Sequence, residues 1–319
     1  MSLPQQPTTP KTYIFGPVPS RRLGFSLGVD LVPYKVCTLD CVYCQINRTT
    51  LKTTERKPYV PAQTLLAGLK HRLEEGVHPD VITLTGSGEP TLNIALGELI
   101  DGIRTLTSFE IAVMTNGTLF YREDVRSECA KADIVLPSLD AALADIYENV
   151  NRPHPDLTVE HQIKGLEAFR NEFTGRLWLE IFLVDNLNTG LHHVQALQRA
   201  INRIRPDKVQ LNTAVRPTTE ANISSLSLEA MQVIADQLGP NCEIIADFAK
   251  PSRNTVEPVG SQHVFDMIAR HPCTLSDICL ALSIQQNQAW QFIETLKTQG
   301  SITAKTHGGN TYFQTANSK

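Results

Sequence analysis

The sequence lacks several features that would place the protein in whole classes. No apolar run approaches the ~18 residues that a membrane-spanning helix requires. The first ten residues are polar and rich in proline, without the apolar centre of a secretory signal. No internal repeat or low-complexity tract is evident. We therefore expect a cytoplasmic protein with reduced cysteines and no membrane partner.

Neither sign of charge dominates. A net charge of −4 gives no global argument for binding nucleic acid. The basic residues are nevertheless concentrated in one stretch: Lys11, Arg21, Arg22, Lys35, Arg48, Lys52, Arg56 and Lys57. This stretch could serve an anionic substrate, or it could be the solvated rim of a domain. Proximity in sequence does not decide between the two.

Cysteines are few, but three of the seven lie within eight residues, in the string Cys37-Thr-Leu-Asp-Cys41-Val-Tyr-Cys44. No fourth cysteine or histidine lies nearby. Cysteine thiolates hold iron–sulfur clusters, and three ligands leave one iron of a [4Fe–4S] cluster open. A structural zinc site usually takes four ligands, and disulfide frameworks suit short secreted chains. We favour a cluster, with a zinc site or a chance grouping as the alternatives.

Short apolar strands alternate with helical patterns from residue 26 to about residue 248. The expected strands are 26–32, 80–85, 110–115, 133–137, 177–184 and 208–212, with one more helix and strand ending near 246. Such alternation indicates βαβ units and a parallel sheet. The expected fold is α/β, a partial (β/α)6-type TIM barrel. Functional residues should then follow the carboxyl ends of strands.

The last quarter of the chain has a different pattern. Residues 248–260 read as a linker, followed by helices at 262–270, 275–282 and 286–300 and a hairpin around Gly308-Gly309. Three helices and a hairpin resemble a winged helix. Its balanced charge makes DNA an unlikely partner and favours substrate docking or dimer packing. We expect a disordered tail at 1–11, a barrel domain at 12–250, and a linker with a winged-helix-like domain at 251–319.

A second informative string, Thr85-Gly86-Ser87-Gly88-Glu89, follows the expected strand 80–85. Its glycines permit a tight turn and close approach of the backbone to a ligand. Glu89 adds a carboxylate at the strand end. Alone, this string could be an ordinary turn with an exposed acid. It gains weight because it lies one βα unit after the cysteines, so that the two loops should be neighbours.

The cysteine triplet, with Tyr43 before its last member and a Gly-Ser-Gly-Glu string downstream, resembles the radical S-adenosylmethionine (SAM) superfamily. The resemblance implies that Cys37, Cys41 and Cys44 hold a [4Fe–4S] cluster whose open iron binds SAM. It implies that Gly86, Ser87, Gly88 and Glu89 hold the methionine amine, with Tyr43 against the adenine. A flavodoxin- or ferredoxin-like donor would reduce the cluster. SAM would then yield a 5′-deoxyadenosyl radical that abstracts hydrogen.

Three later strings extend this resemblance. Thr115 and Asn116 resemble a polar pair that contacts SAM, and Ser138 or Asp140 would reach the ribose hydroxyls. Arg152 would meet the substrate or the SAM carboxylate. Asn116 and Asp140 are also good helix-capping residues, so that capping is the alternative interpretation.

The strings Gly-Glu-Pro-Thr-Leu, Thr-Asn-Gly, Ser-Leu-Asp-Ala and Asn-Arg-Pro are similar to the catalytic domain of wyosine-type tRNA enzymes over about residues 12–220. Residues 15–24 look more like their uncharacterised bacterial radical SAM relatives. Two departures oppose the wyosine reaction. No cysteine precedes Cys37 to hold a second cluster, and Glu180 stands where those enzymes carry arginine. Arg216 could replace that charge and is a further substrate candidate.

The leading hypothesis is therefore a radical SAM enzyme with an unidentified substrate, which could be tRNA. One alternative is a peptide or small-molecule substrate docked by the C-terminal domain. Another is an iron–sulfur transcriptional regulator, although a regulator would need no SAM-binding turn.

Overall fold

The computed structural model describes residues 13–316 apart from positions 21, 221, 247–259 and 283. The expected tail at 1–11 and most of the expected linker lie outside these residues. Within the described chain, no helix is both long enough and apolar enough to cross a bilayer.

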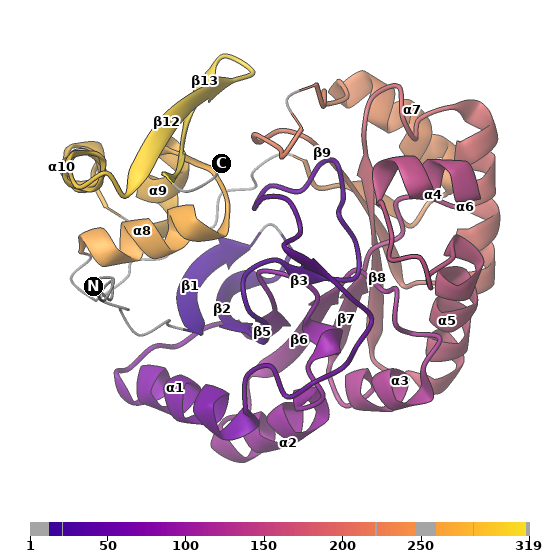
Figure 1. The fold of residues 1–319 in the computed structure, drawn as a ribbon, viewed down its shortest axis with the longest axis horizontal. Coiled ribbons are helices and arrows are strands. Elements are labelled where there is room, and N and C mark those ends of the chain that lie inside the picture. The colour runs from indigo at the N-terminus through magenta and orange to yellow at the C-terminus, as the bar shows by residue number, and fades with distance from the viewer. Residues whose placement is uncertain (1–12, 21, 221, 247–259, 283, 317–319) are drawn as a thin grey trace, which may run out of the picture.

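An eight-stranded sheet forms the centre of the molecule (Figure 1). Its order is β1 (Ile14–Ser20), β2 (Gly24–Asp30), β5 (Val81–Thr85), β6 (Glu110–Thr115), β7 (Ile134–Pro137), β8 (Arg176–Leu183), β9 (Lys208–Thr213) and β10 (Cys242–Ile244). β1 runs antiparallel to β2, and every other neighbouring pair is parallel. The order ends at β1 and β10, so the barrel is partial, as the sequence predicts.

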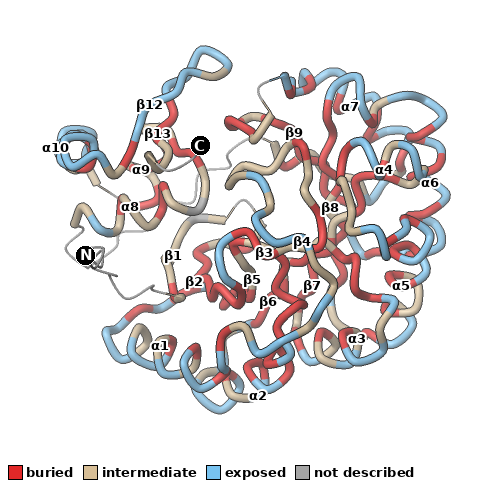
Figure 2. The backbone as a smooth tube through the Cα atoms, in the orientation of Figure 1, coloured by how far each residue is buried: buried red, intermediate tan, exposed pale blue. Residues whose placement is uncertain are grey.

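Helices cover the outer face of this sheet (Figure 1). They are α1 (Ala62–Glu74), α2 (Leu96–Leu106), α3 (Glu123–Cys129), α4 (Ala144–Val150), α5 (Val159–Glu172), α6 (Leu191–Ile204) and α7 (Leu228–Leu238), with the short 3-10 helix η1 (Pro90–Leu92) after β5. Figure 2 shows buried strands inside a ring of helices with exposed outer faces. β7 is buried at all four positions because side chains cover both faces of the sheet.

The helix bounds follow from local chemistry. Thr158 caps α5 by accepting the backbone N–H of His161, and Ser227 caps α7 by accepting that of Ala230. α6 buries Val194, Leu197 and Ile201, which recur at helical spacing on one face. These caps and stripes are readable in the sequence. The predicted strands and C-terminal helices lie within a few residues of the observed ones.

One strand of the sheet was not predicted. β1 contains Gly16, Pro17 and Pro19, residue types that are depleted in strands. Proline lacks a backbone N–H and is tolerated at a sheet edge, which is where β1 lies. The sequence pattern also missed β3 (Val36–Cys37) and β4 (Leu51–Lys52), a two-residue parallel pair around the cysteine loop.

The C-terminal unit contains α8 (Ser261–Arg270), β11 (Cys273–Thr274), α9 (Leu275–Leu282), α10 (Gln286–Thr298), β12 (Ile302–His307) and β13 (Asn310–Thr315). Its antiparallel sheet has the order β11-β13-β12, and it has a core of its own around Val264, Ile293 and Phe313. The three helices and the hairpin occur where the sequence predicts them, whereas β11 was not expected. The winged-helix assignment stays a prediction.

This unit packs beside the mouth of the barrel, with α8 and α9 against β1 (Figure 1). The Tyr312 hydroxyl donates to the Val215 carbonyl at 2.7 Å, just beyond the end of β9. His307 Nε2 lies 3.3 Å from the carbonyl oxygen of Ala214. The unit therefore contributes to whatever surface the strand ends create.

Candidate active site

The cysteine loop, residues 37–44, lies over the carboxyl ends of β2 and β5. The Lys35 N–H donates to the Ser87 carbonyl at 2.8 Å, and the Glu89 N–H donates to the Val36 carbonyl at 2.9 Å. A Cβ atom on Gly88 would lie 1.8 Å from the Val36 oxygen. Glycine at position 88 is therefore what allows the two loops to touch, as their separation by one βα unit predicts.

Two other segments hold the cysteine loop from its far side. The Val42 N–H donates to the Val150 carbonyl at 3.0 Å, at the end of α4. Both the N–H and the hydroxyl of Thr219 donate to the Cys44 carbonyl, at 2.9 and 2.7 Å. The loop is thus fixed by residues that follow β5, β7 and β9.

Each of the three cysteine sulfurs has a side-chain nitrogen beside it. Lys35 Nζ lies 3.0 Å from Cys44 Sγ, Asn151 Nδ2 lies 3.4 Å from Cys41 Sγ, and Asn116 Nδ2 lies 3.6 Å from Cys37 Sγ. All three nitrogens donate to sulfur. The Asn151 and Lys35 contacts were not predicted, because the spacing of the cysteines does not show what faces them.

The three cysteines are partly buried. Burial, with the Glu89 carboxylate nearby, raises the pKa of Cys37 to about 11. Burial and Asp140 raise the pKa of Cys41 well above its ordinary range. A buried thiol deprotonates when a metal replaces its proton, so that thiolates at these positions require a cationic partner such as iron.

The residues present fit a [4Fe–4S] cluster. No group of three or more His, Cys, Asp or Glu in the described chain converges on one metal ion, as a zinc site would require. In a cubane each thiolate binds a different iron, so the sulfurs need not converge. Burial and the charges of Cys41, Asp140 and Cys37 raise the pKa of the Tyr147 hydroxyl, which has no hydrogen-bond partner among the described residues. Cluster sulfides are acceptors of the kind it lacks.

Asp30 organises the glycine turn. It is buried at the end of β2, where Oδ1 accepts the Ser87 N–H at 2.9 Å and Oδ2 accepts the Ser87 hydroxyl at 2.6 Å. The predicted role of Ser87 did not include this partner. An acid at the end of an otherwise apolar strand was the signal that could have identified Asp30.

Glu89 joins the turn to the next loop. Its side chain is 1% exposed. Oε1 accepts from the Thr91 N–H (3.0 Å) and from the hydroxyls of Thr91 and Thr115 (2.6 Å each). Oε2 accepts from the Asn116 N–H at 2.7 Å. Burial raises the pKa of Glu89 against these bonds, which favour its charged form. The structure thus brings together Glu89, Thr115 and Asn116, as the sequence predicts.

Asp140 joins the loop after β7 to the cysteine loop. Its carboxylate accepts from Asn151 Nδ2 (2.7 Å), from the Phe182 N–H (2.8 Å) and from the Tyr43 hydroxyl. Burial raises the pKa of Asp140 to about 6. The Tyr43 ring stacks on Phe182, with ring centres 4.0 Å apart. Of the predicted pair, Asp140 contacts Tyr43, while the backbone of Ser138 forms an isolated parallel β-bridge with Glu180 in the adjacent strand.

A cavity of about 410 Å³ opens between the glycine turn and the C-terminal unit. Five predicted site residues line it: Tyr43, Cys44, Gly86, Ser87 and Arg216. The lining does not include the other predicted SAM contacts Glu89, Thr115, Asn116, Ser138 and Asp140. Arg216 is buried, and Arg152 is not part of the lining but pairs with Glu220 at 2.7 Å.

Several lining residues were not predicted. An ion pair joins Arg22 to Glu180 at 2.7 Å, and Asn212 donates to Glu180 at 3.0 Å. Met267 and His271 come from the C-terminal unit. The local pattern gives only a weak signal for these residues, because Glu180 and Asn212 lie within strands and the others lie in segments that follow no predicted strand end.

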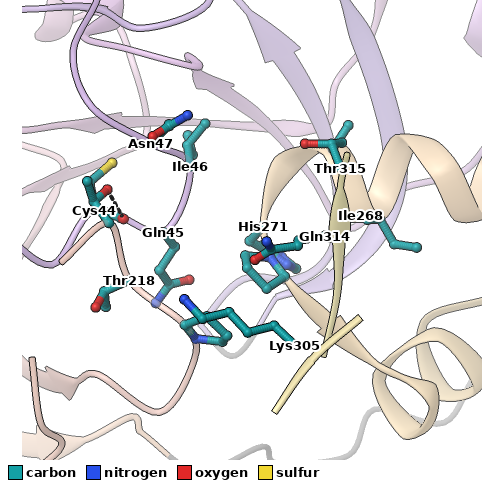
Figure 3. A pocket seen from close by; sticks show the side chains of 14 residues that line it. Cys44, Gln45, Ile46, Asn47, Thr218, Ile268, His271, Lys305, Gln314 and Thr315 are labelled. Atoms are coloured by element: carbon teal, nitrogen blue, oxygen red, sulfur yellow. Dashed lines mark hydrogen bonds between the residues drawn. The ribbon is translucent and has the colours of Figure 1, made fainter. Parts of the chain in front are cut away.

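A smaller cavity of about 90 Å³ lies on the other side of Cys44. Figure 3 shows residues 44–47 facing His271, Lys305 and Thr315 of the C-terminal unit across it. Cys44 and His271 line both cavities. The C-terminal unit therefore forms part of the surroundings of the cysteine loop.

Comparison with known proteins defines the class to which this site belongs. The family model described as "Radical SAM superfamily" matches residues 31–197, which include the cysteine loop, the turn ending in Glu89, and the loops after β6 and β7. The chain belongs to the radical SAM superfamily. As a member of this superfamily, it is an enzyme that uses a [4Fe–4S] cluster and SAM.

Curated relatives narrow the family to the UPF0026 proteins. The chain is 30% identical over 312 residues to the UPF0026 protein of Helicobacter pylori, a match covering 94% of this chain and 96% of that protein. It is also 32% identical over 292 residues to a protein named "GTPase Obg" in Brachyspira hyodysenteriae. That match covers 91% of this chain and 43% of the relative. The chain thus spans less than half of the second relative.

Solved structures share the fold. A radical SAM methyltransferase from Sphaerobacter thermophilus aligns with a TM-score of 0.52 and 18% identity, over 69% of this chain and 66% of that chain. Streptococcus suis SuiB bound to S-adenosylmethionine aligns with a TM-score of 0.51 and 16% identity, over 70% and 51%. At this level of identity the likeness shows the barrel fold, and the substrate has to be argued from the site.

Proposed function

We propose that this radical SAM enzyme acts on a compact substrate carrying an anionic group, bound next to SAM in the 410 Å³ cavity beside Cys44. Cys37, Cys41 and Cys44 would hold the cluster. When bound, the reduced cluster supplies the electron that cleaves SAM to methionine and a 5′-deoxyadenosyl radical, which takes a hydrogen atom from the substrate. An external flavodoxin- or ferredoxin-like protein is the proposed electron source.

The protein residues would orient the two ligands and exclude water. Gly86, Ser87 and Glu89 would bind the methionine end of SAM. Asp30 holds Ser87 in place, and the Thr91 and Thr115 hydroxyls hold Glu89, so these groups are positioned before SAM binds. Tyr43, stacked on Phe182 and bonded to Asp140, would present a rigid face to the adenine. Asn116 and Asp140 would help to fix SAM through the same network, with Thr115 and Ser138 in supporting positions.

The cavity lining supports the substrate class. Arg216 brings a guanidinium group to it, and guanidinium matches carboxylate or phosphate in a two-bonded geometry. Arg22 also lines the cavity, where it is paired with Glu180. Phe15, Val18, Met114 and Met267 supply apolar contact. A pocket of this size with a few polar groups is typical of small-molecule sites. A small molecule or a single side chain of a peptide fits this description.

The observation against a large RNA surface is that most described cations of the basic stretch are paired; Lys52 is an exception and donates to the Arg152 carbonyl. Arg48 pairs with Asp40 at 3.0 Å, Arg56 with Asp124 at 2.7 Å, and Lys57 with Glu55 at 2.8 Å. Arg22 and Lys35 face Glu180 and Cys44. Lys11 and Arg21 lie outside the described residues. Paired cations contribute less to phosphate binding, so this stretch supports RNA binding less than its sequence alone suggests. The likeness to wyosine-type enzymes stays a prediction.

The C-terminal unit, residues 251–319 in the proposed division, would complete the cavity of a barrel domain at residues 12–250. Met267 and His271 support this role. A winged-helix-like unit would then dock the substrate instead of binding DNA. We also propose a cytoplasmic location, because reduced cysteines and a [4Fe–4S] cluster suit a reducing compartment.

Anaerobic assays of 5′-deoxyadenosine release test the function. The reconstituted chain is incubated with SAM and dithionite, and then with either a low-molecular-mass cell extract or a tRNA fraction. We expect release that depends on reductant and is stimulated by the small-molecule extract, with no release from Cys41→Ala. Stimulation by tRNA alone would replace the proposed substrate class with RNA, and no reductant-dependent release would refute the radical reaction for this chain.

A further inference from the structure

Lys35 is buried beside the cysteine loop in a fixed backbone position. Its side chain and backbone together are 3% exposed, and its φ of 58° is in the left-handed region. The Lys35 N–H donates to Ser87, and its carbonyl accepts the N–H of Thr50 at 3.0 Å. A lysine rarely adopts this conformation without support from its surroundings. The structure holds this backbone where the ammonium reaches Cys44.

The charge around the cysteines is otherwise acidic. The Glu89 carboxylate helps to raise the pKa of Cys37, and the Asp140 carboxylate helps to raise that of Cys41. The positively charged Lys35 ammonium interacts electrostatically with the three cysteines, most strongly with Cys44. Its Nζ lies 3.0 Å from Cys44 Sγ. Because Lys35 is buried, solvent and salt screen its charge much less than they screen a surface lysine.

Resting on the proposed ligation of a cluster by the three cysteines, we propose that Lys35 sets the reduction potential of that cluster. Reduction adds one electron, and therefore one negative charge, to the cluster and its thiolates. A nearby ammonium stabilises the more negative, reduced form, as do hydrogen bonds to the sulfurs. The amides of Asn116 and Asn151 act in the same direction as neutral donors. Lys35 makes the largest contribution because it alone among these three donors carries a full charge.

The position of Lys35 gives it a function distinct from binding SAM. A lysine that only neutralised the SAM carboxylate would affect affinity for SAM and leave the SAM-free cluster unchanged. A lysine that donates to Cys44 Sγ affects the cluster before SAM arrives. The potential of the SAM-free protein therefore separates the two roles.

The test is an anaerobic redox titration of the full-length protein, monitored by electron paramagnetic resonance of the reduced cluster, without SAM. The variants are Lys35→Met, Lys35→Gln and Lys35→Arg. Lys52→Met is the matched control, since Lys52 pairs with Cys37 across β3 and β4 but has an exposed side chain. We expect the reduced-to-oxidised ratio at a fixed potential to fall about tenfold in Lys35→Met, equivalent to about 59 mV for one electron.

Lys35→Gln should show a similar decrease, whereas Lys35→Arg and Lys52→Met should match the wild-type protein. Iron content and visible absorbance show whether each variant holds its cluster, so if Lys35→Met does not assemble one, the Gln and Arg variants decide. A loaded Lys35→Met or Lys35→Gln protein with a wild-type potential overturns the proposal and leaves the proposed function intact. Failure of the wild-type chain to bind a cluster refutes the proposed function itself.

Discussion

Gly88 and Glu89 are adjacent residues that meet opposite requirements. Gly88 is needed because it has no side chain, since the Val36 carbonyl occupies the space of a Cβ. Glu89 is needed because its side chain accepts four hydrogen bonds from Thr91, Thr115 and Asn116. The sequence pattern identified both residues, but it assigned them only to SAM. The structure adds that they join the cysteine loop, the turn and the loop after β6.

Gly88→Ala should disrupt the contact between the two loops. Its Cβ would meet backbone at 1.8 Å, which no side-chain rotation can relieve, so the Glu89 N–H bond to Val36 should be lost. We expect the free energy of unfolding to fall by about 1–3 kcal/mol, together with lower iron incorporation. Urea unfolding and iron analysis measure both. Gly190→Ala is the control, because its Cβ would meet nothing within 4 Å; equal losses in the two variants would contradict the role of Gly88.

Glu89→Gln should weaken both the network and the SAM site. An amide has one acceptor oxygen, so it cannot accept from the Asn116 N–H and from Thr91 and Thr115 as the carboxylate does. We expect the metal-free protein to lose about 1–3 kcal/mol of unfolding free energy, and SAM affinity to fall at least about tenfold. Equilibrium dialysis measures SAM binding. The exposed Glu98→Gln is the control, and wild-type SAM affinity in Glu89→Gln would refute its proposed role.

At the scale of elements, His193 and Asn188 connect α6 to the strand ends that carry the site. The Ala142 N–H donates to His193 Nε2 at 3.0 Å, and His193 Nδ1 lies 2.6 Å from the Asn188 carbonyl. Nδ1 therefore carries the proton. Asn188 Nδ2 donates to the carbonyls of Asp140 and Phe182, at 2.9 and 2.8 Å. The loop that holds Asp140 thus depends on a neutral histidine.

The contribution of His193 to stability should consequently decrease in mild acid. Burial lowers the pKa of His193 below its ordinary 6.5. The hydrogen bond to Asn188 and the charge of Asp145 raise this pKa in part, and the charge of His192 lowers it further. The unfolded chain then binds the proton more readily than the folded chain, so the stabilisation is complete above pH 6.5 and is lost as pH falls toward the folded pKa. Urea unfolding of the metal-free protein at a series of pH values measures this. His193→Gln should show a smaller slope below pH 6.5, and an identical slope would contradict the prediction.

At the scale of the whole molecule, the cavity belongs to two units that are far apart in sequence. The barrel supplies Arg22, Glu180 and Arg216, and the C-terminal unit supplies Met267 and His271. Tyr312 and His307 hold the hairpin of this unit to the carbonyls that follow β9. The C-terminal unit therefore has to stay docked for the cavity to keep its shape.

Tyr312→Phe should loosen this docking. It removes one hydrogen bond of 2.7 Å between the units, worth about 1 kcal/mol, while keeping the aromatic ring. We expect faster hydrogen exchange in peptides from α8 to β13, with unchanged exchange in the strands of the barrel. Tyr59→Phe is the control, since its hydroxyl bonds only to the nearby Glu55 carbonyl. Exchange equal to wild type in Tyr312→Phe would show that this bond does not hold the unit.

The sequence by itself determined the features that depend on local order. The cysteine spacing, the glycine turn and the alternation of apolar strands with amphipathic helices are written in short segments, because each reflects chemistry within a few residues. They sufficed to predict a partial barrel and a [4Fe–4S] cluster, and SAM followed from the resemblance to a known superfamily that these strings carry. β1 was missed because its prolines argue against a strand, and only pairing with β2 at the sheet edge makes them tolerable.

The tertiary structure decided which side chains face one another across long separations. Lys35 faces Cys44, Asn151 faces Cys41, and Arg22 faces Glu180, pairs that no local pattern reveals. It also paired much of the basic stretch with acids and placed the C-terminal unit at the cavity. The physical reason is that strand order and loop packing bring distant residues together, and the resulting burial and charge exist only in the folded chain.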